Sequence, residues 1–353
     1  MTGRPDREFV VIGENIHTTR VVRRPGPLVA SDAVGRESVV FVDEAGETRF
    51  LPIPDEERRT QDYEEGRVKH VRSAVRLALE GDGADRETGA AYLLALARNQ
   101  VDSGARFLDV NVDEYSHRLP EQMEAMRGLV GLIGPAVPVP LSIDSSNLEI
   151  IATGIAAAER SAGPPMLNSA SLERVEALDL AAEAGGPVIV TAAGESGMPQ
   201  NAEGRVANAS RMIDLAAGKR IALERIFVDP LVFPISVDGE FGEHCLGAIR
   251  ELRRLYGPEI HITGGMSNVS FGLPVRRLIN DAFLVLAIEA GADSGIVDPI
   301  SNGIERVLPL DRSARPFQLA LDVLTGADRH CRAYMKAYRA GELEGHEALV
   351  AAP

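Results

Sequence analysis

Short apolar runs alternate with longer helical patterns along most of this chain, with a spacing of about 20 to 35 residues that is typical of βα units. The runs that predict strands are Phe9–Ile12, Phe107–Val110, Val139–Ile143, Pro165–Leu167, Val188–Thr191, Arg225–Val228, Ile260–Thr263 and Gly295–Val297. The segments between them are rich in Ala, Leu and Glu and predict helices, among them Ser171–Ala184, Ala207–Ala217, His244–Tyr256 and Asn280–Ala290.

Strands and helices in this order predict an α/β fold, a (β/α)8 TIM barrel. A doubly wound sheet is the competing architecture, and it needs a glycine fingerprint for phosphate after its first strand. Here the first run is followed by Gly13-Glu14-Asn15-Ile16-His17, which does not contain G-x-G-x-x-G. We therefore expect one barrel domain that spans residues 1–353.

One segment interrupts the repeating pattern after the first strand. Residues 18–85 or so are polar and precede a helix that we expect to begin near Thr88, so they form a long insertion in the first βα loop. Val39–Val42 and Thr48–Leu51 flank a polar turn and predict a hairpin. Because loops at this end of a barrel carry function, we interpret the insertion as a lid or docking surface. Sideways packing, at a homodimer interface, is the alternative.

The chain continues beyond the last predicted strand. Phe317–Leu324 and Ala327–Tyr338 have helical patterns. We expect a C-terminal helical piece over residues 310–340 or so that closes the outer ring of the barrel.

Polar side chains follow the predicted strands, at the ends that build the active site of a barrel. The set is acidic and amide-bearing, and contains no Lys: Glu14, Asn15, Asp109, Asn111, Asp144, Asn168, Asp229 and Asn268. Each one alone has the simpler role of a helix cap. Together they suit a 2-amino-4-oxo-pyrimidine edge, because a carboxylate accepts hydrogen bonds from its amine and ring N–H. The aspartates could instead bind magnesium or calcium. The Asn and Ser residues between them weaken the case for a metal site, so we expect no required metal.

Gly264–Pro274 is the most informative single stretch. Its two leading glycines allow the backbone to approach a ligand closely, and Ser267, Asn268 and Ser270 add neutral hydrogen-bonding groups. This loop suits the orientation of a polar heterocycle better than attack on an ester. A tight βα turn with no ligand is the simpler interpretation.

Composition excludes several classes of function. The formal net charge is -15 and no basic cluster stands out, which argues against nucleic-acid binding. Cys245 and Cys331 are too few for a disulfide framework or a thiolate metal site. The first residues lack an apolar targeting region and no run approaches a membrane span, so we expect a cytoplasmic protein.

Five strand-end motifs resemble, in the same order, those of the methyltetrahydrofolate:corrinoid methyltransferases and of the folate domain of cobalamin-dependent methionine synthase. Dihydropteroate synthase is a more distant relative. The motifs are Gly104–Val112, Leu141–Asn147, Leu167–Ser171, Val228–Leu231 and Met266–Ser270, and the resemblance runs from about Ala90 to Pro299.

The resemblance implies a pterin-binding barrel that moves a methyl group between N5 of tetrahydrofolate, or 5-methyltetrahydrofolate, and the cobalt of a corrinoid. Asp144, Asn168 and Asp229 match residues that hydrogen-bond the pterin ring. Asn268 matches the catalytic Asn that reaches N5, and Arg276 matches an Arg near the folate. Glu14, Asp109 and Asn111 are further expected contacts, since they lie in the matching strand-end segments. The sequence does not fix the direction of transfer.

The departures from the family pattern bear on the partner of the reaction more than on the pterin-binding site. Asn15 and His17 stand where the family's Gly-Glu-Arg-x-Asn has Arg and Asn. The corrinoid-carrying motif Asp-x-His-x-x-Gly is matched at Asp328 and His330 without its Gly, so we expect a separate corrinoid protein. A dihydropteroate synthase-like enzyme is one alternative, disfavoured because Ser267-Asn268-Val269 replaces its Ser-Arg-Lys. A non-catalytic folate-binding protein is the other.

Overall fold

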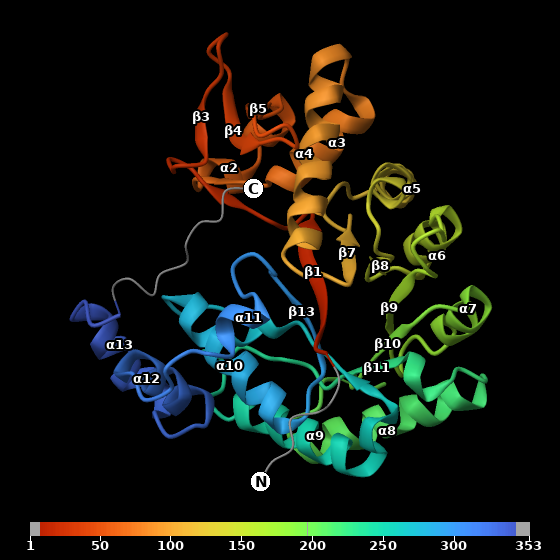
Figure 1. The fold of residues 1–353 in the computed structure, drawn as a ribbon, viewed down its shortest axis with the longest axis vertical. Helices are drawn as coiled ribbons and strands as arrows, with labels where there is room; N and C mark the ends of the chain where they lie inside the picture. Colours follow the sequence, from red (N-terminus) through yellow and green to blue (C-terminus); the bar gives the residue numbers. More distant parts are fainter. Residues whose placement is uncertain (1–7, 196, 344–353) are drawn as a thin grey trace. The chain divides into compact units, whose positions relative to one another are not determined.

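Parallel strands form the largest sheet among the described residues (Figure 1). They are β1 (Val10–His17), β7 (Phe107–Asn111), β8 (Leu141–Asp144), β9 (Met166–Ala170), β10 (Val188–Thr191), β11 (Ile226–Asp229), β12 (His261–Ile262) and β13 (Ser294–Val297). The sheet order is β12-β11-β10-β9-β8-β7-β1-β13. A parallel bridge between Gly265 and Ile296 then joins the β12 side to the β13 side. The ring closes, and the predicted (β/α)8 barrel is confirmed.

The computed structural model describes residues 8–195 and 197–343. The N-terminal residues on which the targeting prediction rests, and Ser196, lie outside these ranges. Among the residues described, no helix combines the length and apolar character needed to cross a membrane.

A helix follows each strand of the barrel, as the alternating pattern predicts. The main ones are α4 (Gly83–Asp102), α5 (Leu119–Ile133), α6 (Leu148–Ala157), α7 (Ala177–Ala184), α8 (Ala202–Gly218), α9 (Phe241–Tyr256), α10 (Arg276–Ala290) and α12 (Arg315–Leu324). Helices α6 and α8 begin at asparagines, because the side-chain oxygens of Asn147 and Asn201 accept backbone N–H groups at 2.8 Å. Helix α7 starts later than predicted, since the chain first makes a turn in which Arg174 donates to the Ser171 carbonyl.

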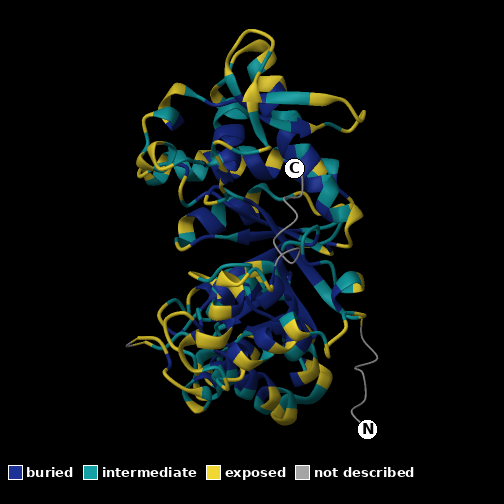
Figure 2. Ribbon diagram, turned by 90° about the vertical axis from the view of Figure 1, so that its left-hand side faces the viewer, coloured by how far each residue is buried: buried dark blue, intermediate teal, exposed yellow. Residues whose placement is uncertain are grey.

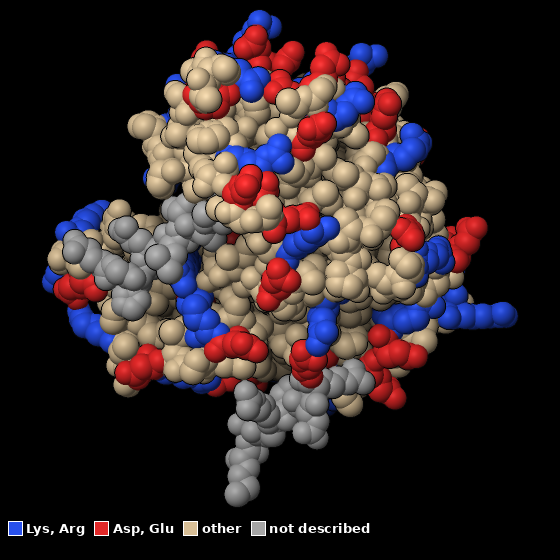
Figure 3. All heavy atoms as spheres, turned by 45° about the horizontal axis from the view of Figure 1, so that its top comes forward, with Lys and Arg blue, Asp and Glu red and all other residues tan. Residues whose placement is uncertain are grey.

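The chain divides into two compact units, which we describe separately. Residues 8–12 and 167–343 belong to the first unit, and residues 13–166 to the second. Strands are buried along most of their length, while exposed residues concentrate on helices and turns (Figure 2). Basic and acidic side chains are intermixed over the face drawn in Figure 3.

The predicted insertion forms a small β structure in the second unit. Strands β3 (Val29–Ser31), β4 (Glu37–Val42) and β5 (Thr48–Pro52) make one antiparallel sheet, and β2 (Val22–Arg23) pairs with β6 (Arg67–Val68). Val42 pairs with Thr48 across the β4–β5 turn, so the predicted hairpin is confirmed. Two short helices follow, α1 (Asp55–Arg58) and α2 (Gln61–Glu64).

The boundary between insertion and barrel differs from the prediction. The helix expected near Thr88 begins at Gly83, and a further helix, α3 (His70–Glu80), precedes it. The sheet packs on this helix pair: the Phe41 ring meets the Tyr92 ring edge-on at 4.9 Å, and Tyr92 Oη lies 2.7 Å from His70 Nδ1. These contacts fit sideways packing of the insertion on α4.

In the first unit, the C-terminal helices confirm the predicted helical piece. Helices α11 (Ile304–Val307) and α12 are followed by α13 (Arg332–Arg339). The last helix begins later than predicted because Asp328 accepts the backbone N–H groups of Ala333 and Tyr334 and ends the preceding turn. Asp328 is therefore a helix cap, and His330 beside it is exposed.

The closing strands of the ring are tied by one carboxylate. Asp293 Oδ1 accepts the Ile262 backbone N–H at 2.8 Å and lies 3.0 Å from Arg253 Nη2. Asp293 Oδ2 lies 3.0 Å from His261 Nδ1. Burial alone would raise the pKa of Asp293, but its bonds to His261 and Ile262 hold that pKa below its usual range.

Candidate functional site

Asp229 ends strand β11 in the first unit. Its Oδ1 accepts the backbone N–H of Leu231 at 2.7 Å. Burial raises the pKa of Asp229 to about 6, against the lowering effects of this hydrogen bond and of the Arg205 charge. A carboxylate in such a place is well suited to accept hydrogen bonds from a buried N–H edge, because little water competes for it.

Two adjacent glycines connect Asp229 to Asn268. A Cβ at Gly264 would lie 3.2 Å from Asp229 Oδ1, and one at Gly265 would lie 2.8 Å from the amide nitrogen of Asn268. Both side chains therefore pack against the bare backbone of the β12 exit. Asn268 itself is exposed, on the 3-10 helix η4 (Met266–Ser270). The loop predicted to approach a ligand closely thus holds a carboxylate on one side and an amide on the other.

Asn168 lies on the same face of the sheet as Asp229. It pairs with Ile189 of β10, which pairs with Phe227 of β11, two residues before Asp229. The Asn168 side chain is buried. Of the predicted pterin contacts, the first unit therefore brings Asn168, Asp229 and Asn268 onto three strand ends of one sheet.

Arg276 is placed differently from the other predicted residues. Its Nε donates to Ser270 Oγ at 3.0 Å and its Nη2 to the Ser267 carbonyl at 2.9 Å. The guanidinium also stacks over the exposed Phe271 ring at 4.5 Å. Arg276 thus braces the loop that carries Asn268 and stays exposed at its surface.

The second unit gathers another set of predicted residues. His17 Nε2 lies 2.8 Å from Asp109 Oδ2, and the Asn111 amide donates to Asp144 Oδ2 at 2.8 Å. Asp109 is fully buried. Burial and the Asp109 charge raise the pKa of Asp144 to about 7, against the opposing effects of His17 and Asn111. Burial alone would lower the pKa of His17, but the hydrogen bond to Asp109 and the charges of Asp109, Asp144 and Glu14 together hold that pKa above its ordinary value.

These groups could hold a metal or share a proton. Among the residues that the structure describes, His17, Asp109 and Asp144 have ligand atoms within 4.8 Å of one another. The direct hydrogen bond between His17 and Asp109 already explains their closeness. The expectation that no metal is required stays a prediction.

Glu14 and Asn15 contact an arginine that the sequence analysis did not single out. Arg20 Nη1 lies 3.4 Å from Glu14 Oε1, and Arg20 Nη2 donates to Asn15 Oδ1. The family pattern has its Arg at position 15, whereas here the guanidinium beside Glu14 belongs to Arg20. His17 and Arg20 were missed because only their neighbours matched the motif. The available signal was their position, since His17 ends the buried strand β1 and Arg20 follows it closely.

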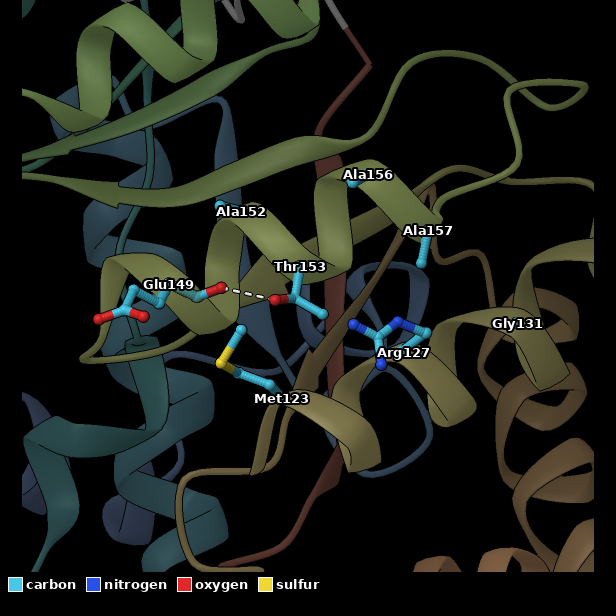
Figure 4. A pocket seen from close by; sticks show the side chains of 8 residues that line it. All are labelled: Met123, Arg127, Gly131, Glu149, Ala152, Thr153, Ala156 and Ala157. Carbon is cyan, nitrogen blue, oxygen red and sulfur yellow. Dashed lines mark hydrogen bonds between the residues drawn. The ribbon is translucent and has the colours of Figure 1, made fainter. Parts of the chain in front are cut away.

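A groove between α5 and α6 in the same unit carries no such chemistry. It is lined by Met123, Arg127, Gly131, Glu149, Ala152, Thr153, Ala156 and Ala157 (Figure 4). These residues come from the outer sides of two helices rather than from strand ends. We therefore do not assign the groove to the functional site.

Comparison with known proteins places this chain in a family. Residues 82–298 match the model of the pterin-binding enzyme family. The chain belongs to this family of pterin-binding enzymes. The matched range begins just before α4 and ends just after β13, so β1, the insertion and the C-terminal helices lie outside it.

Two curated relatives indicate which members of this family the chain resembles. Over 266 residues, the chain is 30% identical to a methylcorrinoid:tetrahydrofolate methyltransferase of Eubacterium limosum, covering 74% of this chain and 92% of that protein. It is also 30% identical over 234 residues to a methionine synthase of Mycobacterium tuberculosis, covering 62% of this chain and 19% of that protein. The predicted resemblance to folate and corrinoid methyltransferases is confirmed, and the chain is an enzyme of this kind.

Solved structures of dihydropteroate synthase are also similar to this pterin-binding enzyme. The Xanthomonas albilineans enzyme with 4-aminobenzoic acid matches with a TM-score of 0.49 at 18% identity, over 64% of this chain and 86% of that one.

Proposed function

We propose that this enzyme moves a methyl group between N5 of tetrahydrofolate and the cobalt of a corrinoid held by a separate protein. The observation that carries the proposal is the arrangement of Asp229, Gly264, Gly265 and Asn268 in the first unit. It offers a carboxylate acceptor and an amide donor beside a backbone without side chains. The similarity to a methylcorrinoid:tetrahydrofolate methyltransferase and to a methionine synthase supports the same reaction.

The proposed chemistry assigns separate tasks to these residues. Asp229 accepts hydrogen bonds from the amine and ring N–H of the pterin, and Asn168 adds an amide contact on the same face. Asn268 donates to N5, which stabilises the charge that develops when a tertiary amine leaves. A neutral amide does this without acting as a general acid.

We also propose the remaining contacts that the resemblance implies. Asp144 accepts from the pterin, with Asp109 and Asn111 as its polar neighbours, and Glu14 is a further folate contact. Arg276 holds the Asn268 loop near the folate. The corrinoid partner is proposed from the sequence and from the similarity to the two curated relatives. The homodimer and the cytoplasmic location are proposed from the sequence alone.

Calorimetric titration with 5-methyltetrahydrofolate tests the pterin site. We expect Asp229→Asn and Asn168→Ala each to weaken binding by about 30-fold, or about 2 kcal/mol, because a hydrogen bond to a charged or buried group is lost. Asp179→Asn, at an exposed ion pair with Lys219, is the matched control and should leave binding unchanged. Absence of binding to the unaltered protein at millimolar ligand would refute the proposal.

A spectroscopic assay tests the reaction itself. Methylation of free cob(I)alamin, or demethylation of methylcobalamin in the presence of tetrahydrofolate, changes the visible spectrum and reports both directions. Pterin binding without either reaction, including with a cognate corrinoid protein, would instead indicate a binding protein.

A further inference from the structure

Arg205, in the first turn of α8, is a fully buried arginine that the proposed chemistry has not used. Its Nη1 donates to the carbonyl of Pro230 at 2.6 Å and also to the carbonyl of Leu231. Within the described residues, its Nε and Nη2 are buried without a hydrogen-bond partner. A buried cation that lacks a direct carboxylate partner destabilises the folded state, so we looked for a functional role that would explain it.

The guanidinium and Asp229 hold opposite ends of one peptide group. Arg205 binds the oxygen of the Pro230–Leu231 peptide, and Asp229 Oδ1 binds its N–H at 2.7 Å. Leu231 has φ of +69°, a left-handed conformation that a branched side chain rarely adopts. Two bonds to a single peptide explain how this conformation is maintained.

Other contacts fix the guanidinium in this place. It lies 4.5 Å above the ring of Phe233, which follows in the same loop. The loop after β11 therefore wraps around Arg205, with two carbonyls and one aromatic face directed at it. The Arg205 side chain is therefore held in place by the same loop whose conformation it stabilises.

We propose that Arg205 is a positioning residue for pterin binding: through the Pro230–Leu231 peptide it orients Asp229 and stabilises its ionised form. This inference rests on the proposed function. It assigns Arg205 no contact with the pterin. Its effect passes through one polarised peptide and through the charge of a buried cation.

The electrostatics agree with this role. The Arg205 charge opposes the effect of burial on the pKa of Asp229, and burial lowers the pKa of Arg205 itself. Cys245, on α9, is the other titratable group that acts on this pair, and burial raises the pKa of its thiol to about 12. Cys245 therefore stays neutral at working pH, and Arg205 is the charge that acts on Asp229.

Arg205→Met, Arg205→Lys and the unaltered enzyme form the test. The carboxyl 13C resonance of Asp229, in protein without folate, gives its titration midpoint independently of any binding. We expect the Met variant to raise that midpoint by at least one pH unit and to weaken 5-methyltetrahydrofolate binding at pH 7 about tenfold or more. The Lys variant, which keeps the charge but not the planar fork, should restore the midpoint and only part of the affinity.

Several outcomes would overturn the inference. An unchanged Asp229 midpoint in the Met variant would show that Arg205 merely supports the loop. If the Met variant does not fold, the Lys variant decides: affinity equal to that of the unaltered enzyme would refute the positioning role. A midpoint that shifts as expected in a protein that binds no folate would refute the proposed function and leave the Arg205–Asp229 coupling intact.

Discussion

At the scale of single residues, the ionised side chain of Asp229 lowers the stability of the folded enzyme, although it is the form proposed to bind the pterin. Its pKa in the folded protein is about 6, above the ordinary value near 3.9. Between these two values the folded state holds a proton that the unfolded chain has already lost. Stability therefore falls as pH rises from about 4 to about 6, and stays lower above that.

We expect Asp229→Asn to be more stable than the original enzyme at pH 8, by on the order of 1–2 kcal/mol, because the neutral amide avoids a buried charge. Thermal melts from pH 4 to pH 8 measure this. The difference should grow through pH 6 and then level off, while folate binding is lost. A difference that does not vary with pH would contradict the assignment of the shifted pKa to Asp229.

Asn268 makes a different prediction, because its contact is expected to strengthen as charge changes at N5. Asn268→Ala should lower the rate of methyl transfer at saturating folate by about 100-fold, with only a few-fold change in folate Kd. Single-turnover kinetics and calorimetry separate the two quantities. Equal losses in both would make Asn268 an ordinary binding contact.

At the scale of the elements, apolar runs predicted the barrel strands well because a strand buried on both faces is apolar throughout. Helix starts were less predictable. The N-terminal turn of α8 reads as polar, and only the structure shows Asn201 capping it. Helix α3 was missed since it lies inside a segment that reads as charged, although Val71, Ala74 and Val75 are its buried face.

In the candidate site, too, some residues could be predicted from the sequence and others could not. Side chains next to strand ends could be listed from the sequence, because chain position alone places them. Arg205 could not, since it lies 24 residues before Asp229 and meets the next loop only through the packing of α8. Contacts of this length depend on tertiary structure rather than on any local pattern.

The β12 exit offers an element-scale prediction. A methyl at Gly264 would press on Asp229 Oδ1 and on Val232 Cγ2 at 3.1 Å, at a φ of +159°. Gly264→Ala should therefore reduce folate affinity about tenfold or more, by displacing Asp229. Gly131→Ala is the control: its Cβ meets nothing within 4 Å in α5, so we expect a gain of about 0.5–1 kcal/mol in stability and unchanged binding. Equal affinities in calorimetry would contradict the close approach.

At the scale of the whole molecule, the insertion behaves as part of the second unit's core. Phe41 and Leu51 are almost fully buried, and Arg49 Nη2 reaches Thr88 Oγ1 in α4 at 3.3 Å. A sheet attached in this way stabilises the helix it covers. Its removal would uncover α4, so a shortened insertion tests stability before it tests docking.

Phe41→Ala isolates that contribution. We expect a loss of about 3–4 kcal/mol in the free energy of unfolding, typical of an aromatic side chain removed from a packed interior. Denaturant unfolding measures it, with Val34→Ala at an exposed turn as the control. Methyl transfer at low temperature should persist in the Phe41 variant. Loss of transfer with unchanged stability would instead favour the lid.

Closure of the strand ring has a consequence for how the protein is made. Val10, in β1, donates its N–H to the carbonyl of Asp293 at 2.9 Å, and Asp293 is synthesised much later than Val10. At about 5–20 residues per second, Asp293 follows Val10 after roughly 15 to 60 seconds of synthesis. Throughout that interval one edge of β1 has no partner strand, and an unpaired edge invites pairing between chains. Chains released before Asp293 has been added lack this partner for β1, so we expect prematurely terminated chains to aggregate more readily than the complete one.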